Sequence, residues 1–121
     1  MDLINACKSN DTEKALGLIM NNNTNLGIVD FCERTALICA CKHKMKEVAL
    51  ELIKTGKSKP DHIAKDRNTA FSWACENGMK EVAYELVSIG TFTINDLLFL
   101  KPEWVEELFI MNPVDVTEVD I

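Results

Sequence analysis

The sequence matches itself when it is shifted by 34 residues. Residues 35–56 match residues 69–90 at 12 of 22 positions, and residues 1–22 match residues 35–56 at 10 positions. A period of this length is typical of solenoids, in which each copy of a small unit buries its apolar face only against its neighbours. The self-match therefore predicts a stack of short repeats, an architecture that usually presents a surface for binding.

Each repeat contains two short segments with the apolar spacing of a helix. In the middle repeat, Thr35 is placed to cap a first helix of about two turns. A break at residues 42–44 precedes a second helix, and Gly56 follows it, where a left-handed C-cap is favoured. The expected inward residues are Ala36, Leu37, Ala40 and Cys41 in the first helix and Val48, Ala49, Leu52 and Ile53 in the second. We therefore expect an all-α fold of helix–turn–helix units.

The inward side chains are smaller in the first helix of each repeat than in the second. Small Ala and Cys side chains let the first helices approach closely, whereas Val, Leu and Ile spread the second helices apart. The array should therefore curve, with the first helices lining a concave groove. Residues 57–68 include Pro60, Asp61 and Asn68, which favour turns. This segment is predicted to project beside the groove as an elongated loop or hairpin, with weak strand pairing at most.

Length and charge narrow the class of partner. The chain has 121 residues, enough for one compact domain with a continuous core. Its net charge of −6 argues against binding to a nucleic-acid backbone, which requires a basic surface. No apolar run approaches the ~18 residues that span a bilayer, and the first residues lack the layout of a secretory signal. We expect an intracellular, cytoplasmic protein that binds neither nucleic acid nor membrane.

Three of the five cysteines follow the repeat. Cys7, Cys41 and Cys75 occupy the same position in successive repeats. Stacked helices lie ~8–10 Å apart, whereas a disulfide needs Cα atoms within ~7 Å, so these residues are predicted to be small core residues. Cys32 and Cys39 are then expected as reduced thiols, consistent with a reducing compartment.

Neither a metal site nor a catalytic site is predicted. Cys39 and His43 are four residues apart and could present two zinc ligands on one helical face, with Cys32 and Cys41 nearby. The remaining spacings match no zinc motif, however, and Cys41 belongs to the core series. With His43 and His62 as its only histidines and no glycine-rich phosphate loop, the chain shows no set of residues that converges on catalysis. We expect a non-enzyme without cofactor or metal.

The repeat resembles the ankyrin repeat. That family's unit of about 33 residues opens its inner helix with T-P-L-H-x-A-A and ends its outer helix before Gly. Residues 35–41 read TALICAC and residues 69–75 read TAFSWAC, each followed by V-A-x-E-L and Gly. The resemblance implies an ankyrin-repeat solenoid that binds proteins. The sequence of residues 35–58 also resembles ankyrin-repeat arrays abundant in giant viruses of amoebae such as mimivirus. That resemblance implies a viral protein that acts in a host cytoplasm.

On this resemblance, residues 1–121 form one ankyrin-repeat domain. Its predicted parts are an N-terminal capping repeat at 1–28, repeats at 29–63 and 64–93, a degenerate C-terminal capping repeat at 94–113 and an acidic tail at 114–121. The alternative for the C-terminal repeat is that the chain continues or dimerises there, leaving Phe109, Ile110 and Met111 partly uncovered.

The repeats depart from the family pattern at three places. The opening Pro is Ala in both copies, and the His that follows is Ile38 or Ser72. The family's usual bonding between hydroxyl and imidazole therefore cannot form. The turn Gly is replaced by Glu33 and Arg67, residue types that disfavour positive φ. The hairpin tips are therefore predicted to differ in shape from those of the family.

The resemblance also implies where a partner would bind, at the hairpin tips and the exposed end of each inner helix. Carried over position by position, the contact residues are Phe31, Cys32, Arg34, Lys42, His43, Lys65, Asp66, Asn68, Glu76 and Asn77, with Lys8 and Ser9 corresponding in the first repeat. The alternative is that most are only solvated polar positions. Phe31 is the expected anchor, because an aromatic side chain at a tip is costly to expose, unless it packs on a neighbouring hairpin.

Trp73 is expected to be partly buried, either against the terminal repeat near Trp104 or facing the groove. The leading functional prediction is a monomeric, non-catalytic module that grips a partner protein with its groove and loop tips. One alternative is an assembly protein that dimerises through its C-terminal repeat, with Trp104 and residues 109–111 at the interface. Another is an adaptor, such as a fragment of a ubiquitin-ligase substrate receptor, by family analogy alone.

Overall fold

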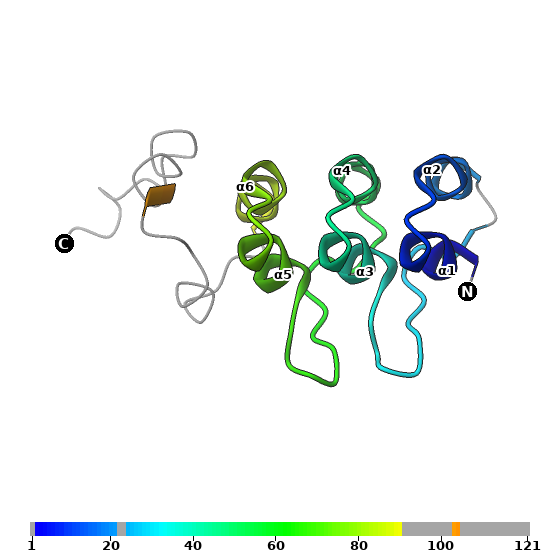
Figure 1. Cartoon of the computed structure of the whole chain (residues 1–121), viewed down its shortest axis with the longest axis horizontal. Coiled ribbons are helices and arrows are strands. Elements are labelled where there is room, and N and C mark those ends of the chain that lie inside the picture. Colours follow the sequence, from blue (N-terminus) through cyan, green and yellow to red (C-terminus); the bar gives the residue numbers. More distant parts are fainter. Residues whose placement is uncertain (1, 22–23, 91–102, 105–121) are drawn as a thin grey trace.

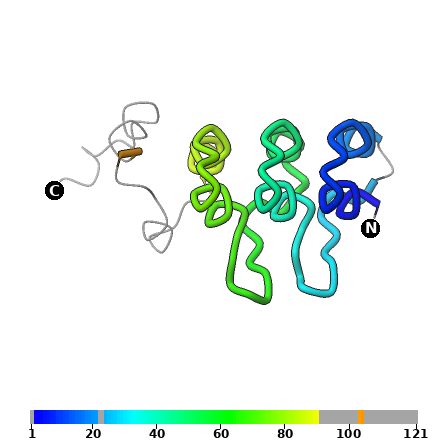
Figure 2. Tube along the Cα trace, viewed as in Figure 1, coloured from blue at the N-terminus to red at the C-terminus, as the bar shows by residue number. Residues whose placement is uncertain are grey.

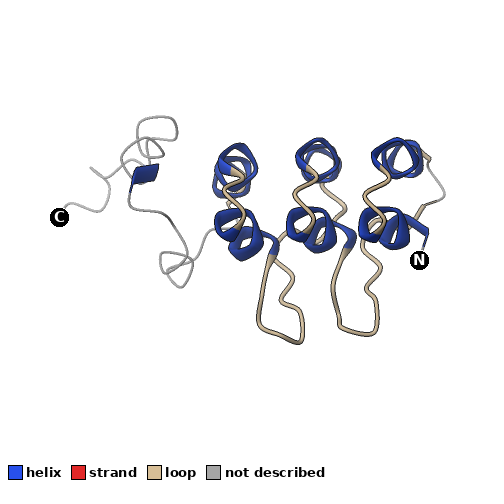
Figure 3. Ribbon diagram, viewed as in Figure 1, coloured by secondary structure: helices blue, strands red, loops and turns tan. Residues whose placement is uncertain are grey.

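The computed structural model describes residues 2–21, 24–90 and 103–104, and it contains six named helices in this part of the chain. They form three antiparallel pairs, coloured in chain order in Figure 1 and by secondary structure in Figure 3. The helices are α1 (Asp2–Lys8), α2 (Thr12–Met20), α3 (Ala36–Lys42), α4 (Lys46–Thr55), α5 (Ala70–Glu76) and α6 (Lys80–Ser88). The predicted all-α fold is confirmed.

The helix pairs stack side by side in two rows. Helices α1, α3 and α5 form the inner row, and α2, α4 and α6 form the outer row (Figure 2). Each helix packs against its partner in the pair and against the equivalent helix of the next repeat. Two long loops, before α3 and before α5, project from the inner row in the same direction (Figure 1). This is the arrangement of nearest-neighbour contacts that the 34-residue period predicts.

The core runs through all three pairs, and the repeating cysteines belong to it. Cys7, Cys41 and Cys75 are buried at equivalent positions of α1, α3 and α5, which confirms their predicted role as core residues. The five cysteines all lie in the described residues, and no disulfide joins them. Burial, aided by the neighbouring Cys39 thiol, raises the pKa of Cys7 to about 12. The Cys7 thiol therefore stays protonated and unreactive at neutral pH.

The helix ends follow the expected capping chemistry. The Thr35 hydroxyl oxygen accepts a hydrogen bond from the Ile38 backbone N–H at 3.2 Å, as predicted for the start of α3. At the start of α5, Thr69 and Ser72 each accept a bond from the other's backbone N–H. Ser72 thus provides a second bond that Ile38 cannot provide in the middle repeat. Gly56 ends α4 in the left-handed conformation, with φ of 70°.

The two hairpins end in tight turns of matching backbone. In the first hairpin the Glu33 N–H donates to the Asp30 carbonyl at 2.9 Å, and in the second Arg67 N–H donates to Ala64 O at 3.0 Å. Glu33 has φ of 60° and Arg67 has φ of 72°, so both adopt the conformation that glycine would adopt there. Glu33 and Arg67 thus take positive φ although their residue types disfavour it, because these turns impose the left-handed conformation despite its cost for residues with a Cβ. The predicted difference from the family's tip shape stays a prediction. Among the described residues, strand pairing is limited to a single bridge between Val29 and Thr35.

The described part of the C-terminal region consists of residues 103–104. The Trp104 ring meets Tyr84 of α6 edge-on, with ring centroids 6.4 Å apart, and only 8% of Trp104 is exposed. The remainder of the predicted capping repeat at 94–113, including Phe109, Ile110 and Met111, and the acidic tail at 114–121 lie outside the described residues. None of the helices in the described ranges has the length and hydrophobicity needed to cross a bilayer.

Candidate partner-binding face

The predicted contact residues lie in the two hairpins and at the C-terminal ends of α1, α3 and α5, and we call these regions together the inner face. Its residues are Lys8, Phe31, Cys32, Arg34, Lys42, His43, Lys65, Asp66, Asn68, Glu76 and Asn77. Contacts between neighbouring repeats link most of them, so the face is continuous across the three helix pairs.

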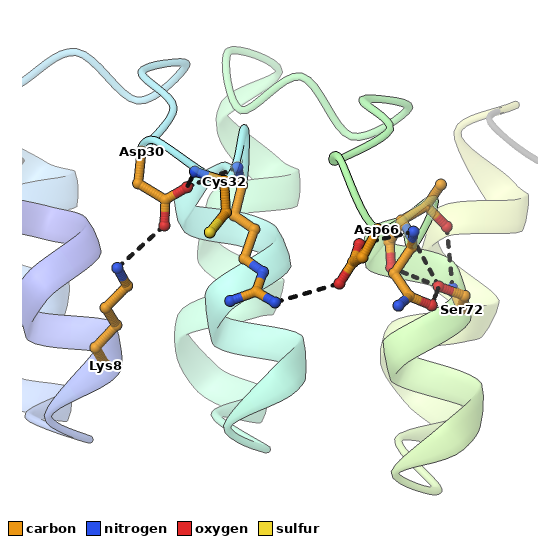
Figure 4. A network of polar contacts seen from close by, with 8 residues as sticks. Lys8, Asp30, Cys32, Asp66 and Ser72 are labelled. Atoms are coloured by element: carbon orange, nitrogen blue, oxygen red, sulfur yellow. Dashed lines mark hydrogen bonds and ion pairs between the residues drawn. The ribbon is translucent and has the colours of Figure 1, made fainter.

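A buried carboxylate organises the first hairpin. The Asp30 side chain is fully buried, and its Oδ1 accepts hydrogen bonds from the backbone N–H groups of Cys32 and Arg34, each at 2.9 Å. Its Oδ2 lies 3.0 Å from Nζ of Lys8, at the end of α1 (Figure 4). Asp30 thus binds both the backbone of its own hairpin tip and Lys8 of the preceding repeat. Sequence reasoning did not identify this residue, although an aspartate two residues before a tip N–H is a known turn former.

The same contacts decide the charge of Asp30. Burial is the largest single influence and opposes ionisation, but the bonds from Arg34 N–H, Lys8 and Cys32 N–H together outweigh it. The pKa of Asp30 is therefore lowered, and the carboxylate is ionised at neutral pH.

The second hairpin is held by the first. Arg34 Nη2 lies 3.2 Å from Asp66 Oδ2, the backbone N–H of Lys65 donates to the Cys32 carbonyl at 3.1 Å, and His62 Nε2 lies 2.8 Å from the Glu33 carbonyl oxygen. Figure 4 shows Asp66 on the side of the second hairpin that faces the first. The pKa of Asp66 is lowered, chiefly by the backbone N–H of Asn68 and also by Arg34, although burial opposes the shift.

Several predicted contact residues therefore have structural partners within the chain. Besides the pair of Arg34 and Asp66, Asn77 Nδ2 donates to the carbonyl oxygens of Cys41 at 2.8 Å and Lys42 at 3.1 Å, so it caps the end of α3 from the next repeat. Asn68 Oδ1 accepts a bond from the Ser72 hydroxyl at 3.1 Å. These polar side chains join repeats or brace a hairpin, which the repeat pattern alone did not indicate.

Two aromatic side chains on the inner face lie beneath lysines. Phe31 is 80% exposed, so a neighbouring hairpin does not bury it, and Nζ of Lys8 lies 5.8 Å from its ring centroid. Trp73 is partly buried, as predicted, with Nζ of Lys42 5.6 Å from its ring centroid. The Trp104 ring contacts Tyr84 in the described structure. Each lysine stands over an aromatic ring at a distance typical of a cation–π contact.

Positive charge converges on His43, at the end of α3. Its pKa is lowered, first by burial and then by the charges of Lys42, Arg34 and Lys8. The same three cations act on the Cys39 thiol one turn earlier, although burial and Asp30 still raise its pKa to about 11. His43 is therefore neutral at neutral pH, and Cys39 is not a thiolate. Within the described ranges, no three His, Cys, Asp or Glu side chains gather as metal ligands.

The outer row carries a second exposed surface that the sequence did not predict. A groove of about 440 Å³ lies between α2 and α4, with Glu47, Glu51 and Lys54 among its charged residues. Met20, at the end of α2, is 81% exposed in this groove. The apolar lining is completed by Leu16, Ile19 and Leu50. The structure therefore presents two candidate surfaces, one on each row of helices.

The comparisons with known proteins agree with this architecture. A family model described as ankyrin repeats, in three copies, matches residues 3–96, which is more than half of the chain. No curated protein matches the chain at a significant level. The resemblance to repeat arrays of amoebal viruses therefore stays a prediction.

Proposed function

Because the chain belongs to the ankyrin repeat family, whose members are generally protein–protein interaction modules, we propose that it binds a partner protein through the inner face. The observation that carries the proposal is Phe31, a large apolar side chain that is 80% exposed at the tip of a hairpin. Buried aromatic anchors contribute most of the binding energy in many interfaces, whereas exposure of such a ring to water is costly.

The tip of the first hairpin is also preorganised for binding. The Asp30 side chain, which precedes Phe31, accepts hydrogen bonds from the backbone N–H groups of Cys32 and Arg34, which follow it, so the ring is presented from an ordered turn. An ordered turn loses little conformational entropy when a partner covers it. On this proposal the polar contacts between repeats keep the hairpins in register, and Phe31, Lys65 and Glu76 are the exposed positions that contact the partner.

Phe31 and Met20 form a matched pair for the test. They are exposed to the same extent, 80% and 81%, but lie on the inner face and in the outer groove respectively. Partners captured from the native cell should bind Phe31→Ala about thirtyfold more weakly, the effect of an interface anchor worth roughly 2 kcal/mol. Binding to Met20→Ala should be unchanged.

Isothermal titration with purified partner and each variant measures both affinities. The reverse result, in which Met20→Ala weakens binding and Phe31→Ala does not, would move the site to the outer groove. Equal binding by both variants would also reject the inner face. Substitution of Arg34 or Asn68 is less informative, because their contacts with Asp66 and Ser72 also hold the hairpins.

Assembly through the C-terminal repeat is less well supported. Trp104 packs on Tyr84 of its own chain and is only 8% exposed, so it is not available to a second copy in this conformation. The other residues named for that interface lie outside the described structure.

A further inference from the structure

The inner face is less acidic than the chain as a whole. The chain has 19 acidic and 13 basic residues, for a net charge of −6. The part of the inner face formed by α1, the first hairpin and α3 nevertheless carries three cations: Lys8 lies beside Asp30 and Phe31, Arg34 beside Asp66, and Lys42 over Trp73. The second hairpin adds the exposed residues Lys65, Asp66 and Arg67, and α5 ends at Glu76.

The carboxylates that pair with Lys8 and Arg34 lie beneath them or to one side, whereas the exposed Glu33 of the same hairpin pairs with neither. Asp30, the partner of Lys8, is fully buried, whereas the Lys8 side chain is 37% exposed. Asp66, the partner of Arg34, belongs to the next hairpin. In the part of the chain that the structure describes, no carboxylate lies within ion-pair distance of Lys42, whose ammonium group stands over Trp73. Lys42 is therefore a cation available to a ligand.

Lys8 and Lys42 each stand beside an aromatic ring. Lys8 lies over Phe31 and Lys42 lies over Trp73, at 5.8 Å and 5.6 Å from the ring centroids. A ligand that places a carboxylate on the ammonium group can therefore place an apolar group on the neighbouring ring. Carboxylates pair with ammonium and guanidinium groups through charge-assisted hydrogen bonds, which are stronger than neutral ones.

We propose that the partner segment bound by the inner face is an acidic peptide with an apolar side chain among its carboxylates. This inference rests on the function proposed above and specifies the partner of the same surface. The carboxylates lie over Lys42, Arg34 and Lys8, and the apolar side chain contacts Phe31.

Two synthetic peptides test the inference directly. One alternates glutamate and serine around a central leucine, and the other replaces every glutamate with glutamine. Both carry a fluorophore, and their binding to the full chain is measured by fluorescence anisotropy at low and at physiological salt. We expect the glutamate peptide to bind at least about fivefold more tightly, with an advantage that shrinks as salt is added.

A pair of matched double variants assigns the binding to the cations of the inner face. Lys8→Gln with Lys42→Gln should remove most of the preference for the glutamate peptide. Lys46→Gln with Lys54→Gln removes the same charge from α4 on the outer row and should leave the preference intact. Circular dichroism spectra confirm that both variants fold. Equal loss in the two double variants would show non-specific attraction and overturn the inference.

The remaining outcomes separate this inference from the proposed function. If both peptides bind equally and Phe31→Ala weakens both, the inner face is the binding site but does not select acidic ligands, so only this inference fails. If neither peptide binds, the inference is also wrong, whereas the function still depends on the titration of natural partners with Phe31→Ala. A single-stranded oligonucleotide that displaces the glutamate peptide and binds more tightly would show that the inner face recognises phosphates instead.

Discussion

The two hairpins share a backbone but are held in place differently. Both have a turn closed by a hydrogen bond and a residue with positive φ at the same position, Glu33 or Arg67. In the first hairpin, Asp30 braces the tip from inside, and the exposed tip residue is Phe31. The second has Ala64 and Lys65 at these two positions.

The second hairpin consequently depends on its neighbour. Its acidic residue, Asp66, accepts one backbone bond from Asn68 and pairs with Arg34 of the first hairpin. The first hairpin is thus organised by a buried group of its own, whereas the second is held by an exposed ion pair with the previous repeat. Buried charge-assisted bonds stabilise a fold more than exposed ion pairs do, so the two hairpins should respond differently to the same substitution.

Removal of the acidic side chain from each hairpin should give the largest difference. Asp30→Ala leaves two backbone N–H groups and Lys8 without their acceptor, so the free energy of unfolding should fall by about 2–4 kcal/mol. Asp66→Ala removes a side chain that is 36% exposed and should cost less than about 1 kcal/mol. Urea denaturation of both variants gives the two values. Equal losses would mean that the hairpins are held in the same way.

The pH dependence of unfolding should sharpen the contrast. The pKa of Asp30 is lower in the folded chain, so its ionised form adds stability above the ordinary aspartate pKa of about 3.9, and this stability is lost as pH falls through the folded pKa. Asp30→Asn should therefore cost about 1–2 kcal/mol at neutral pH and progressively less below about pH 4.

Asp66→Asn should also lower the free energy of unfolding at neutral pH and less so in acid, because the pKa of Asp66 is lowered as well. The difference from the native chain should be smaller than for Asp30→Asn, because Asp66 is more exposed. Thermal unfolding of the native chain and both variants across the acidic range measures these differences. A loss of unfolding free energy in Asp30→Asn that grows as the pH falls would contradict the assigned role of the Asp30 carboxylate.

Substitution of the two residues with positive φ, Glu33 and Arg67, tests whether the two hairpin tips have the same backbone conformation. Glu33→Gly and Arg67→Gly should each raise the free energy of unfolding by about 0.5 kcal/mol, because relief of the strained conformation slightly exceeds the entropic cost of glycine. Gly56→Ala is the opposite control and should destabilise the chain, since it places a Cβ at φ of 70°. If one of the two substitutions to glycine raised the free energy of unfolding and the other lowered it, the two turns would differ.

The exposed tip residues should have the smallest effect on folding. Phe31→Ala and Lys65→Ala should change the free energy of unfolding by less than about 0.5 kcal/mol, apart from a small loss where Phe31 contacts Lys8. Guanidinium denaturation monitored by circular dichroism checks both values. A loss above about 1 kcal/mol at Phe31 would identify it as a structural residue and weaken its assignment as a binding anchor.

Most of the fold could be predicted because the period records which surfaces must be buried. Thr35 as an N-cap, Gly56 as a C-cap and the buried cysteine series all follow from local chemistry and nearest-neighbour packing. The positive φ of Glu33 could not be predicted from its residue type, because hydrogen bonds of the turn outweigh a residue's own conformational preference.

The contacts among the predicted contact residues could not be predicted from the sequence, and their role in binding stays a prediction. Family resemblance placed Arg34, Asp66 and Asn77 on the inner face, yet their bonds join side chains and backbone groups that are 32 to 36 residues apart. Such bonds depend on the distance and direction between neighbouring repeats, which residue types do not encode individually.

The sequence by itself therefore determined the repeat, its helices and their caps, because these depend on local propensity and on apolar periodicity. Only the tertiary structure decided which polar residues of the hairpins and helix ends hold the repeats together and which remain exposed. The physical reason is that a polar side chain at the surface binds whichever donor or acceptor lies within about 3 Å. That distance exists only after the repeats have stacked.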